Sequence, residues 1–391
     1  MKTFVDYAND IKDEVIANRR YLHQNPELGD DLPVTTAFVK SKLEEIGLTC
    51  QEISKCGLVS TIEGAHPGKT ILLRADMDAL PMNELCDLDF KSQTNYAHTC
   101  GHDLHTATLL GAAKILVGMK DQLHGNVKLM FQPAEEAITG SQAMLDGGLL
   151  ENPKVDAGVD MHVMTDMPVG TIGCKTGYSS SSSDIFKITV DGKECHGAQP
   201  QNGIDPINVA AHIHIALQEI IAREIPAAET VVITIGQFHA GTAGNIIPGE
   251  ATMNGTIRCY NEELRAKILK RVNEIVDFTA KAFGTSAKFE VLSETPAIYA
   301  DPEMMDLAKE CLTTLGTDIT LNEEYILTAS DDYARVAKLV PSAFLLIGAA
   351  PAEKEKVFPN HNANVIFNED CLVIGTALFA KIAYEFLNKN K

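Results

Sequence analysis

The sequence lacks three features that would each assign the protein to a definite class. No run of about 18 apolar residues occurs, and the N-terminal segment is amphipathic with mixed charge, so we expect neither a membrane span nor a secretory signal. The nine cysteines form no Cys-x-x-Cys pair, and their scattered distribution predicts reduced thiols in a cytoplasmic protein. Lysine and arginine are too few, 33 against 53 acidic residues, for a partner such as nucleic acid or an anionic membrane.

What is present is the composition of an ordinary globular protein. Hydrophobic residues make up 45% and charged residues 22% of 391 residues, which corresponds to roughly two or three domains. In the first half of the chain, apolar runs typical of strands alternate with helical periodicity. We expect strands near residues 70–73, 125–133 and 155–163, and helices near 102–119 and 140–150. This alternation predicts an α/β domain with a mainly parallel sheet under helices.

A second pattern begins after five consecutive serines at 179–183, which we interpret as a linker, a hinge or a surface loop. The residues that follow read strand, helix, strand, strand, helix, strand, which is the order of the ferredoxin-like unit. A strand at 341–349 and a closing helix then return to the α/β pattern. The sequence thus predicts a discontinuous α/β domain over residues 1–180 and 297–391, interrupted by an inserted domain over 181–296.

Side chains of the kinds that bind metals gather near the ends of the predicted strands. The stretch HTCGHDLHT at 98–106 brings three histidines, a cysteine and an aspartate together directly before a helix. Other strand ends and the loop after the last strand carry carboxylates or a histidine: Asp76, Asp78, Glu135, Glu136, His162 and His361. In open α/β sheets, ligands bind beyond the carboxyl ends of the strands. Because Cys, His and Glu together suit zinc or another borderline divalent ion, these loops predict one shared metal site.

Six short motifs occur in the order seen in the M20 metallopeptidases: RADMDALP, HTCGHDLHT, FQPAEE, HGAQP, NIIP and HNANVIF. The sequence resembles the amidohydrolase branch of that family, which includes N-acyl-amino-acid amidohydrolases (aminoacylases), hippurate hydrolases and auxin-conjugate hydrolases. The resemblance extends from RRYLHQNPELG near the N-terminus to the final helix. It implies a zinc-peptidase-like catalytic domain with an inserted lid domain.

The resemblance also implies two divalent metal ions per subunit, most readily Zn²⁺, with Mn²⁺, Co²⁺ or Ni²⁺ as other options. It assigns the bridging position to Cys100 and the remaining ligand positions to His102, Glu136, His162 and His361. It assigns Glu135 as the catalytic base and Asp78 as the carboxylate that orients His102. A water of lowered pKa would then attack the amide carbonyl while Glu135 takes its proton. Asp76 is not expected to bind metal.

The inserted domain would act as a lid and as the surface through which two chains form a homodimer. The resemblance places His196 beside the developing oxyanion, and Asn245 and Arg258 near the carboxylate of the substrate. The sequence departs from the usual motifs on this substrate side: Glu194-Cys195 replaces glycines, Gln199 replaces a common histidine, and a SEDF-like motif reads Ser330-Asp331-Asp332-Tyr333. These departures bear on specificity and leave the metal ligands intact.

The leading hypothesis is therefore an amidohydrolase that converts N-acyl-L-amino acids to a carboxylate and a free amino acid. A dipeptidase or carboxypeptidase of the same fold is the close alternative. Two readings from other classes stay open: a thiol enzyme with Cys100 as nucleophile and His102 as base, and a binding or regulatory protein that keeps the fold without catalysis. Among the other histidines, His105 is assigned to support of the site or to the helix start, and His23 to a structural or surface position.

Overall fold

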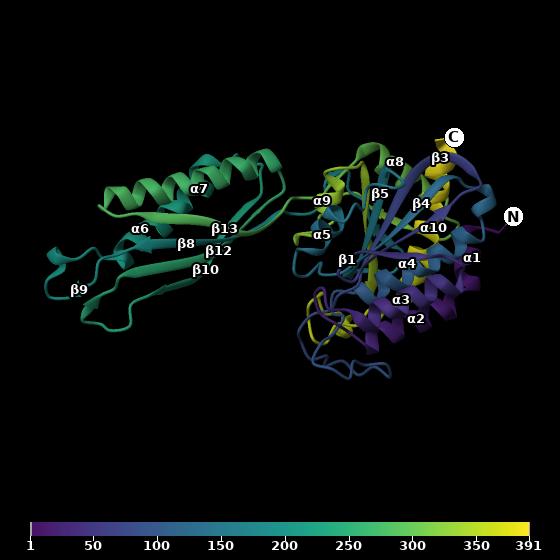
Figure 1. Ribbon diagram of the computed structural model, residues 1–391, viewed down its shortest axis with the longest axis horizontal. Helices are drawn as coiled ribbons and strands as arrows, with labels where there is room; N and C mark the ends of the chain where they lie inside the picture. Colours follow the sequence, from purple (N-terminus) through teal and green to yellow (C-terminus); the bar gives the residue numbers. More distant parts are fainter. Residues whose placement is uncertain (1, 391) are drawn as a thin grey trace. The chain divides into compact units, whose positions relative to one another are not determined.

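The chain forms two units in the computed structural model, which describes residues 2–390 (Figure 1). The first unit comprises Met1–Ser179, Ile298–Ile326 and Asp332–Lys391. The inserted unit comprises Ser180–Ala297 together with Leu327–Asp331, a short return segment that the sequence did not assign to it. Each unit has its own sheet and its own apolar core.

The first unit is built on an eight-stranded sheet with the order β1-β2-β4-β3-β5-β16-β6-β15. Its strands are β1 (Cys50–Ser54), β2 (Gly57–Glu63), β3 (His66–Asp76), β4 (His124–Gln132), β5 (Ala157–Pro168), β6 (Thr171–Gly173), β15 (Thr320–Asn322) and β16 (Ser342–Ala350). The central strands β4, β3, β5 and β16 run parallel, whereas β2 pairs with β1 and β4, and β6 with β16, in the antiparallel sense. The predicted α/β fold with a mainly parallel sheet is confirmed. Central strands such as β16 are buried along nearly their whole length, because helices cover both faces.

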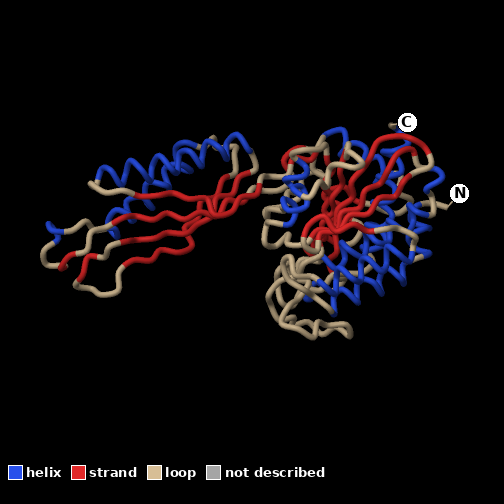
Figure 2. The backbone as a smooth tube through the Cα atoms, in the orientation of Figure 1, coloured by secondary structure: helices blue, strands red, loops and turns tan. Residues whose placement is uncertain are grey.

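Helices pack over this sheet, and Figure 2 shows them in blue beside the red strands. They are α1 (Phe4–Asp10), α2 (Lys12–Gln24), α3 (Pro33–Glu45), α4 (His102–Val117), α5 (Gly140–Asp146), α8 (Pro302–Thr313), α9 (Ala334–Ala337) and α10 (Cys371–Lys389); two short strands, β7 (Gly177–Tyr178) and β14 (Tyr299–Ala300), form a separate pair. α4 packs against α2 and α10. Among the described residues, α10 alone is long and apolar enough to cross a membrane, but 83% of its apolar window is buried, so it is a core helix here.

The inserted unit is a four-stranded antiparallel sheet with the order β10-β12-β8-β13 and two helices on one face (Figure 1). Its main elements are β8 (Ser183–Asp191), α6 (Pro206–Glu219), β10 (Val231–Ala240), β12 (Glu250–Cys259), α7 (Glu262–Ala282) and β13 (Ala287–Thr295), with a short pair formed by β9 (Cys195–His196) and β11 (Ile246–Ile247). The first strand lies between the third and the fourth, as in the predicted ferredoxin-like unit. Alternate residues of β8, such as Phe186 and Ile188, face the helices and form the core with Ile213 and Val276.

The serine run lies where the chain passes from the first unit to the inserted unit, but it is not a solvated loop. All five serines are buried, and β8 already begins at Ser183. Ser181 Oγ donates to the carbonyl oxygen of Thr328 at 2.9 Å, and Ser182 Oγ accepts from the backbone N–H of Cys259 at 3.1 Å. The interpretation as a surface loop is therefore wrong, because these small hydroxyls satisfy buried backbone groups.

Candidate active site

The residues singled out by the sequence meet at the edge of the first unit's sheet where the parallel strands end. Neighbouring strands and two further segments supply them: Asp76 ends β3, Glu135 and Glu136 follow β4, His162 lies in β5, Cys100 and His102 stand at the start of α4, and His361 lies between β16 and α10. The pairing of β3 with β5 ends at Asp160, so His162 extends beyond it toward this edge. This is the edge at which open α/β sheets bind ligands.

Two groups of possible metal ligands share the sulfur of Cys100. One group contains Cys100, His102 and His162, and the other contains Cys100, Glu136 and His361; within each group the ligand atoms lie within 4.8 Å of one another. Cys100 Sγ lies 3.2 Å from His162 Nε2 and 3.3 Å from His361 Nε2. His361 Nε2 lies 3.2 Å from Glu136 Oε1. A thiolate placed in this way can contact two cations at once.

Several buried polar atoms of this cluster have no hydrogen-bond partner of good geometry. Both ring nitrogens of His102 and Oε1 of Glu136 are in this state. The nearest carboxylate oxygens to the two ring nitrogens belong to Asp78 and Asp76, each at 3.5 Å, which is too long for a strong hydrogen bond. A buried polar atom without a partner costs about 1–3 kcal/mol. Divalent cations would satisfy these atoms, so the donor set fits a metal site by chemistry as well as by position.

The negative groups of the cluster attract positive charge, which is seen in the raised pKa values of their neighbours. Burial and the Glu136 carboxylate raise the pKa of the Cys100 thiol, against the opposing effect of His102 and His361. Burial lowers the pKa of His102, but Asp76 and Cys100 outweigh it and raise that pKa well above 6.5. The hydrogen bond to Cys100 and the nearby Glu136 carboxylate raise the pKa of His361 to about 10. The negative groups thus collect protons that a divalent ion would displace.

Asp78 supports the two glutamates through their backbone. Its Oδ1 accepts the N–H of Glu135 at 3.0 Å and its Oδ2 accepts the N–H of Glu136 at 3.2 Å. Ala134, directly before them, has a φ of 51°, an uncommon value for a residue with a side chain. Asp78 therefore fixes the turn that presents both carboxylates, in addition to lying 3.5 Å from the His102 ring. Sequence reasoning missed this contact, because it joins segments that are 57 and 58 residues apart.

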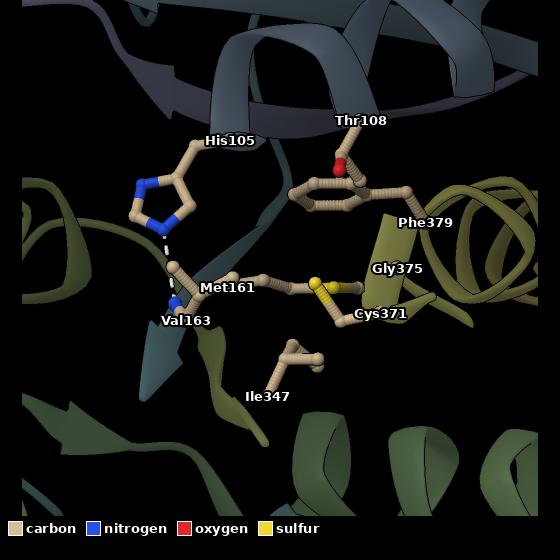
Figure 3. Close-up of a pocket in the computed structure, with 8 residues that line it drawn as sticks. All are labelled: His105, Thr108, Met161, Val163, Ile347, Cys371, Gly375 and Phe379. Atoms are coloured by element: carbon tan, nitrogen blue, oxygen red, sulfur yellow. Dashed lines mark hydrogen bonds between the residues drawn. The ribbon is translucent and has the colours of Figure 1, made fainter. Parts of the chain in front are cut away.

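His105 and Asp76 form a layer behind the cluster. His105 Nδ1 lies 2.6 Å from Asp76 Oδ1. On the other side of the ring, the N–H of Val163 donates to His105 Nε2 at 2.9 Å (Figure 3). Asp76 also lies 2.8 Å from the buried guanidinium of Arg74. A cavity of about 10 Å³ lies beside the His105 ring, lined mainly by apolar side chains. His105 thus fixes the backbone next to His162.

The three candidate residues of the inserted unit lie on its β9, β11 and β12 side. His196 pairs with Ile246, and the N–H of Gly197 donates to the carbonyl oxygen of Asn245 at 2.8 Å, so His196 and Asn245 are neighbours. Arg258 is half-buried on β12 and donates to Ser330 Oγ at 3.2 Å; burial lowers its pKa. The approach of these residues to the metal ligands stays a prediction.

Fold and site together define a class, an α/β metallohydrolase with an inserted α+β unit. The family model of Peptidase family M20/M25/M40 matches residues 72–385, and the chain belongs to this family. The resemblance noted in the sequence is thereby confirmed. Members of the family hydrolyse amide or peptide C–N bonds, and so does this protein.

Relatives of established name are similar to the chain over nearly its whole length. Thermostable carboxypeptidase 2 of Saccharolobus solfataricus is 35% identical over 98% of both chains. N-acetyl-L-cysteine deacetylase of Bacillus subtilis is 35% identical over 86% of this chain and 81% of its own, and hippurate hydrolase of Campylobacter jejuni is 34% identical over 97% and 98%. A crystal structure of a dinuclear metal-binding peptidase of the M20 family from Bacillus subtilis superposes with a TM-score of 0.85 at 31% identity, covering 97% of this chain and 99% of the other.

Proposed function

We propose that the protein is a dinuclear metal-dependent amidohydrolase that cleaves the amide bond of N-acyl-L-amino acids to a carboxylate and a free amino acid. The observation that carries this proposal is the sulfur of Cys100, which lies 3.2 Å from a nitrogen of His162 and 3.3 Å from a nitrogen of His361 and so belongs to two ligand groups. The names N-acetyl-L-cysteine deacetylase and hippurate hydrolase describe relatives that act on small acylated amino acids, which supports this substrate class.

In this proposal two sets of side chains that share the Cys100 sulfur would hold the two cations. His102 and His162 complete one set with Cys100, and Glu136 and His361 complete the other. Zn²⁺ suits these ligands best, and Mn²⁺, Co²⁺ or Ni²⁺ are also compatible with them. When bound, the ions would supply Lewis acidity and a water of lowered pKa.

Glu135 is the residue that moves protons in this proposal. The side chain is 11% exposed, and its Oε2 lies 3.9 Å from His102 Nε2, at the border of the ligand cluster. It would accept the proton of the attacking water and then deliver it to the leaving nitrogen. Asp78 keeps this carboxylate in place through the backbone N–H of Glu135. The next residue, Glu136, directs its carboxylate toward the proposed ligand His361. The two adjacent carboxylates would therefore have different tasks, one transferring protons and the other binding metal.

The inserted unit would bind the rest of the substrate. We assign His196 to the oxyanion and Asn245 and Arg258 to the substrate carboxylate, for which a guanidinium is well shaped. We also propose that two chains form a homodimer through this unit. Because all nine cysteines are free thiols, we place the enzyme in the cytoplasm, where thiols stay reduced.

A carboxypeptidase is the second candidate, because a relative of that name is as similar to the chain as the deacetylase is, at 35% identity. Both reactions hydrolyse an amide bond next to an amino acid with a free carboxylate. They differ in whether the acyl side carries a simple acid or an aminoacyl group. A panel of acetyl-, benzoyl- and aminoacyl-amino acids separates the two by their kcat/KM values.

The experiment that tests the proposal combines metal analysis of the purified protein with that panel. We expect two divalent ions per chain, turnover of acetyl- or benzoyl-amino acids, and loss of turnover after complete chelation. Turnover that survives complete metal removal would instead support Cys100 as a nucleophile. Metal binding without turnover of any amide in the panel would contradict the proposed substrate class.

A further inference from the structure

A buried chain of charged residues lies beside the candidate metal ligands and contacts none of them. It begins on α2 with Arg19 and His23, one turn apart, which are 1% and 4% exposed. His23 Nδ1 lies 2.8 Å from Oδ2 of Asp103, and Arg19 Nε lies 2.8 Å from the same oxygen. The N–H of Arg19 Nε does not point at this oxygen, so the Arg19 contact is an ion pair without a hydrogen bond. The hydrogen bond to Asp103 Oδ2 is made by His23. Asp103 directly follows His102 at the start of α4.

The other side of the His23 ring reaches the loop that precedes α4. His23 Nε2 lies 3.0 Å from Oε1 of Glu84. Glu84 Oε2 accepts the N–H of Ser92 at 2.8 Å, which closes this loop on itself. The next residue, Leu85, donates its N–H to the carbonyl oxygen of Ala363 at 2.7 Å. One ring therefore joins the first turn of α4 to a loop that is fastened to the segment carrying His361.

Both joined segments need such support. α4 begins after Gly101, which has a φ of 98° and offers no side chain to cap the helix, so its first turn depends on contacts made by later residues such as Asp103. His361 has a φ of 65°, a left-handed value that costs of order 1–3 kcal/mol and persists only where the surroundings enforce it. Its own N–H donates to the carbonyl oxygen of Thr99 at 2.9 Å, next to Cys100. The positions of His102 and His361 are thus set by neighbours more than by local preference.

We propose that His23 is a positioning residue: with Arg19 and Glu84, it holds the helix start that carries His102 and the segment that carries His361 at the separation that two cations require. This inference rests on the proposed dinuclear function. Within the core, the His23 ring lies between the carboxylates of Asp103 and Glu84, and the Arg19 guanidinium pairs with Asp103 and Glu369. Groups that hydrogen-bond directly to metal ligands contribute about 10- to 100-fold to metal affinity, and we expect about 10-fold from His23, which acts through Asp103 and Glu84.

Three substitutions of His23 in the full-length protein separate its two contacts. An asparagine amide can replace the donor at Nδ1, a glutamine amide can replace the donor at Nε2, and alanine replaces neither. We expect Zn²⁺ affinity, measured by competition with a chelator, to fall about 10-fold in His23→Ala, and by less in His23→Asn and His23→Gln. At saturating Zn²⁺, kcat recovers toward the native value while KM changes little.

The matched control is Lys128→Met, which removes another buried cation of the first unit. The Lys128 ammonium donates to the carbonyl oxygens of Leu149, Glu151 and Pro153 at 2.6–3.0 Å, so its loss lowers stability without reaching the ligands. Native-like Zn²⁺ affinity in His23→Ala, or an equal loss in Lys128→Met, would overturn the inference. If His23→Ala does not fold, native-like affinity in both His23→Asn and His23→Gln overturns it. If the native protein itself fails to bind two Zn²⁺, the proposed function fails instead.

Discussion

At the scale of single residues, Glu135 is the carboxylate with the sharpest expected effect. Glu135→Gln keeps the shape of the side chain and removes the proton acceptor, so kcat should fall about 10²- to 10⁴-fold. Metal content should stay at the native level, because Glu136 is the proposed ligand. Steady-state kinetics together with metal analysis checks this, with the exposed Glu44→Gln as control. A parallel loss of metal and turnover would make Glu135 a ligand.

His23 gives the metal-free protein a pH-dependent contribution to stability. It faces Arg19 on its own helix, Asp103 and His98 near the start of α4, and Glu84 of the preceding loop. Burial and Arg19 lower the pKa of His23, but Asp103 and Glu84 raise it more, so it lies above 6.5. A raised pKa of this kind stabilises the fold fully below about pH 6.5, and the effect is lost as pH rises through the folded-state pKa.

The prediction compares urea unfolding of metal-free native protein and His23→Gln. The native protein should be more stable than the variant by a margin that is larger near pH 6 than near pH 9. A margin that is constant, or that grows with pH, would contradict the charged state assigned to His23.

At the scale of elements, the start of α4 depends on Gly101. Alanine at this position would require a φ of 98°, and its Cβ would lie 2.3 Å from Cγ2 of Val163. We expect Gly101→Ala to lower the free energy of unfolding by about 2–4 kcal/mol and to weaken metal binding, because His102 follows directly. Gly148→Ala is the control: its φ is 89° but no atom lies within 4 Å of the added Cβ, so only the backbone cost remains. Equal effects of the two changes in urea unfolding would show that the clash is relieved.

The elements with clear periodicity could be predicted from the sequence, and the pairings between distant segments could not. The alternation of inward- and outward-facing residues in β8 and the helical periodicity of α7 are local patterns. The cluster around Cys100 that predicted a metal site is local as well. The antiparallel pairing of β2 with β4 depends on segments far apart, which no local pattern encodes. The same holds for His23, whose partners are 61 and 80 residues away and which by itself looks like any surface histidine.

The serine run shows why composition alone misleads. Consecutive small polar residues are typical of linkers, and the position of this run at the passage between the units fits that expectation. The burial of the run does not fit that expectation. Hydroxyls that hydrogen-bond to backbone groups are as compatible with a core as with solvent. Which hydroxyl finds a partner is decided by the tertiary fold.

At the scale of the whole molecule, each unit has its own core, which predicts separate responses to perturbation. In the inserted unit, the buried carboxylate of Asp184 binds the guanidinium of Arg265 through two contacts of 2.6 and 2.8 Å. Asp184→Asn should destabilise this unit by about 3 kcal/mol, since Arg265 keeps Glu262 and Glu294 as partners. Calorimetry should show a new transition at lower temperature that added Zn²⁺ does not shift. A single transition that Zn²⁺ raises as a whole would mean that the units unfold together.

The insertion of one unit within the other also sets an order of events on the ribosome. β16 belongs between β5 and β6, yet it is synthesised after every strand of the inserted unit. The inserted unit is nearly continuous in sequence, so it can fold first, while the edge of β5 that later pairs with β16 is still unpaired. Because His361 follows β16 in the sequence, a nascent chain completes its donor set only after the inserted unit and β16 have both been made.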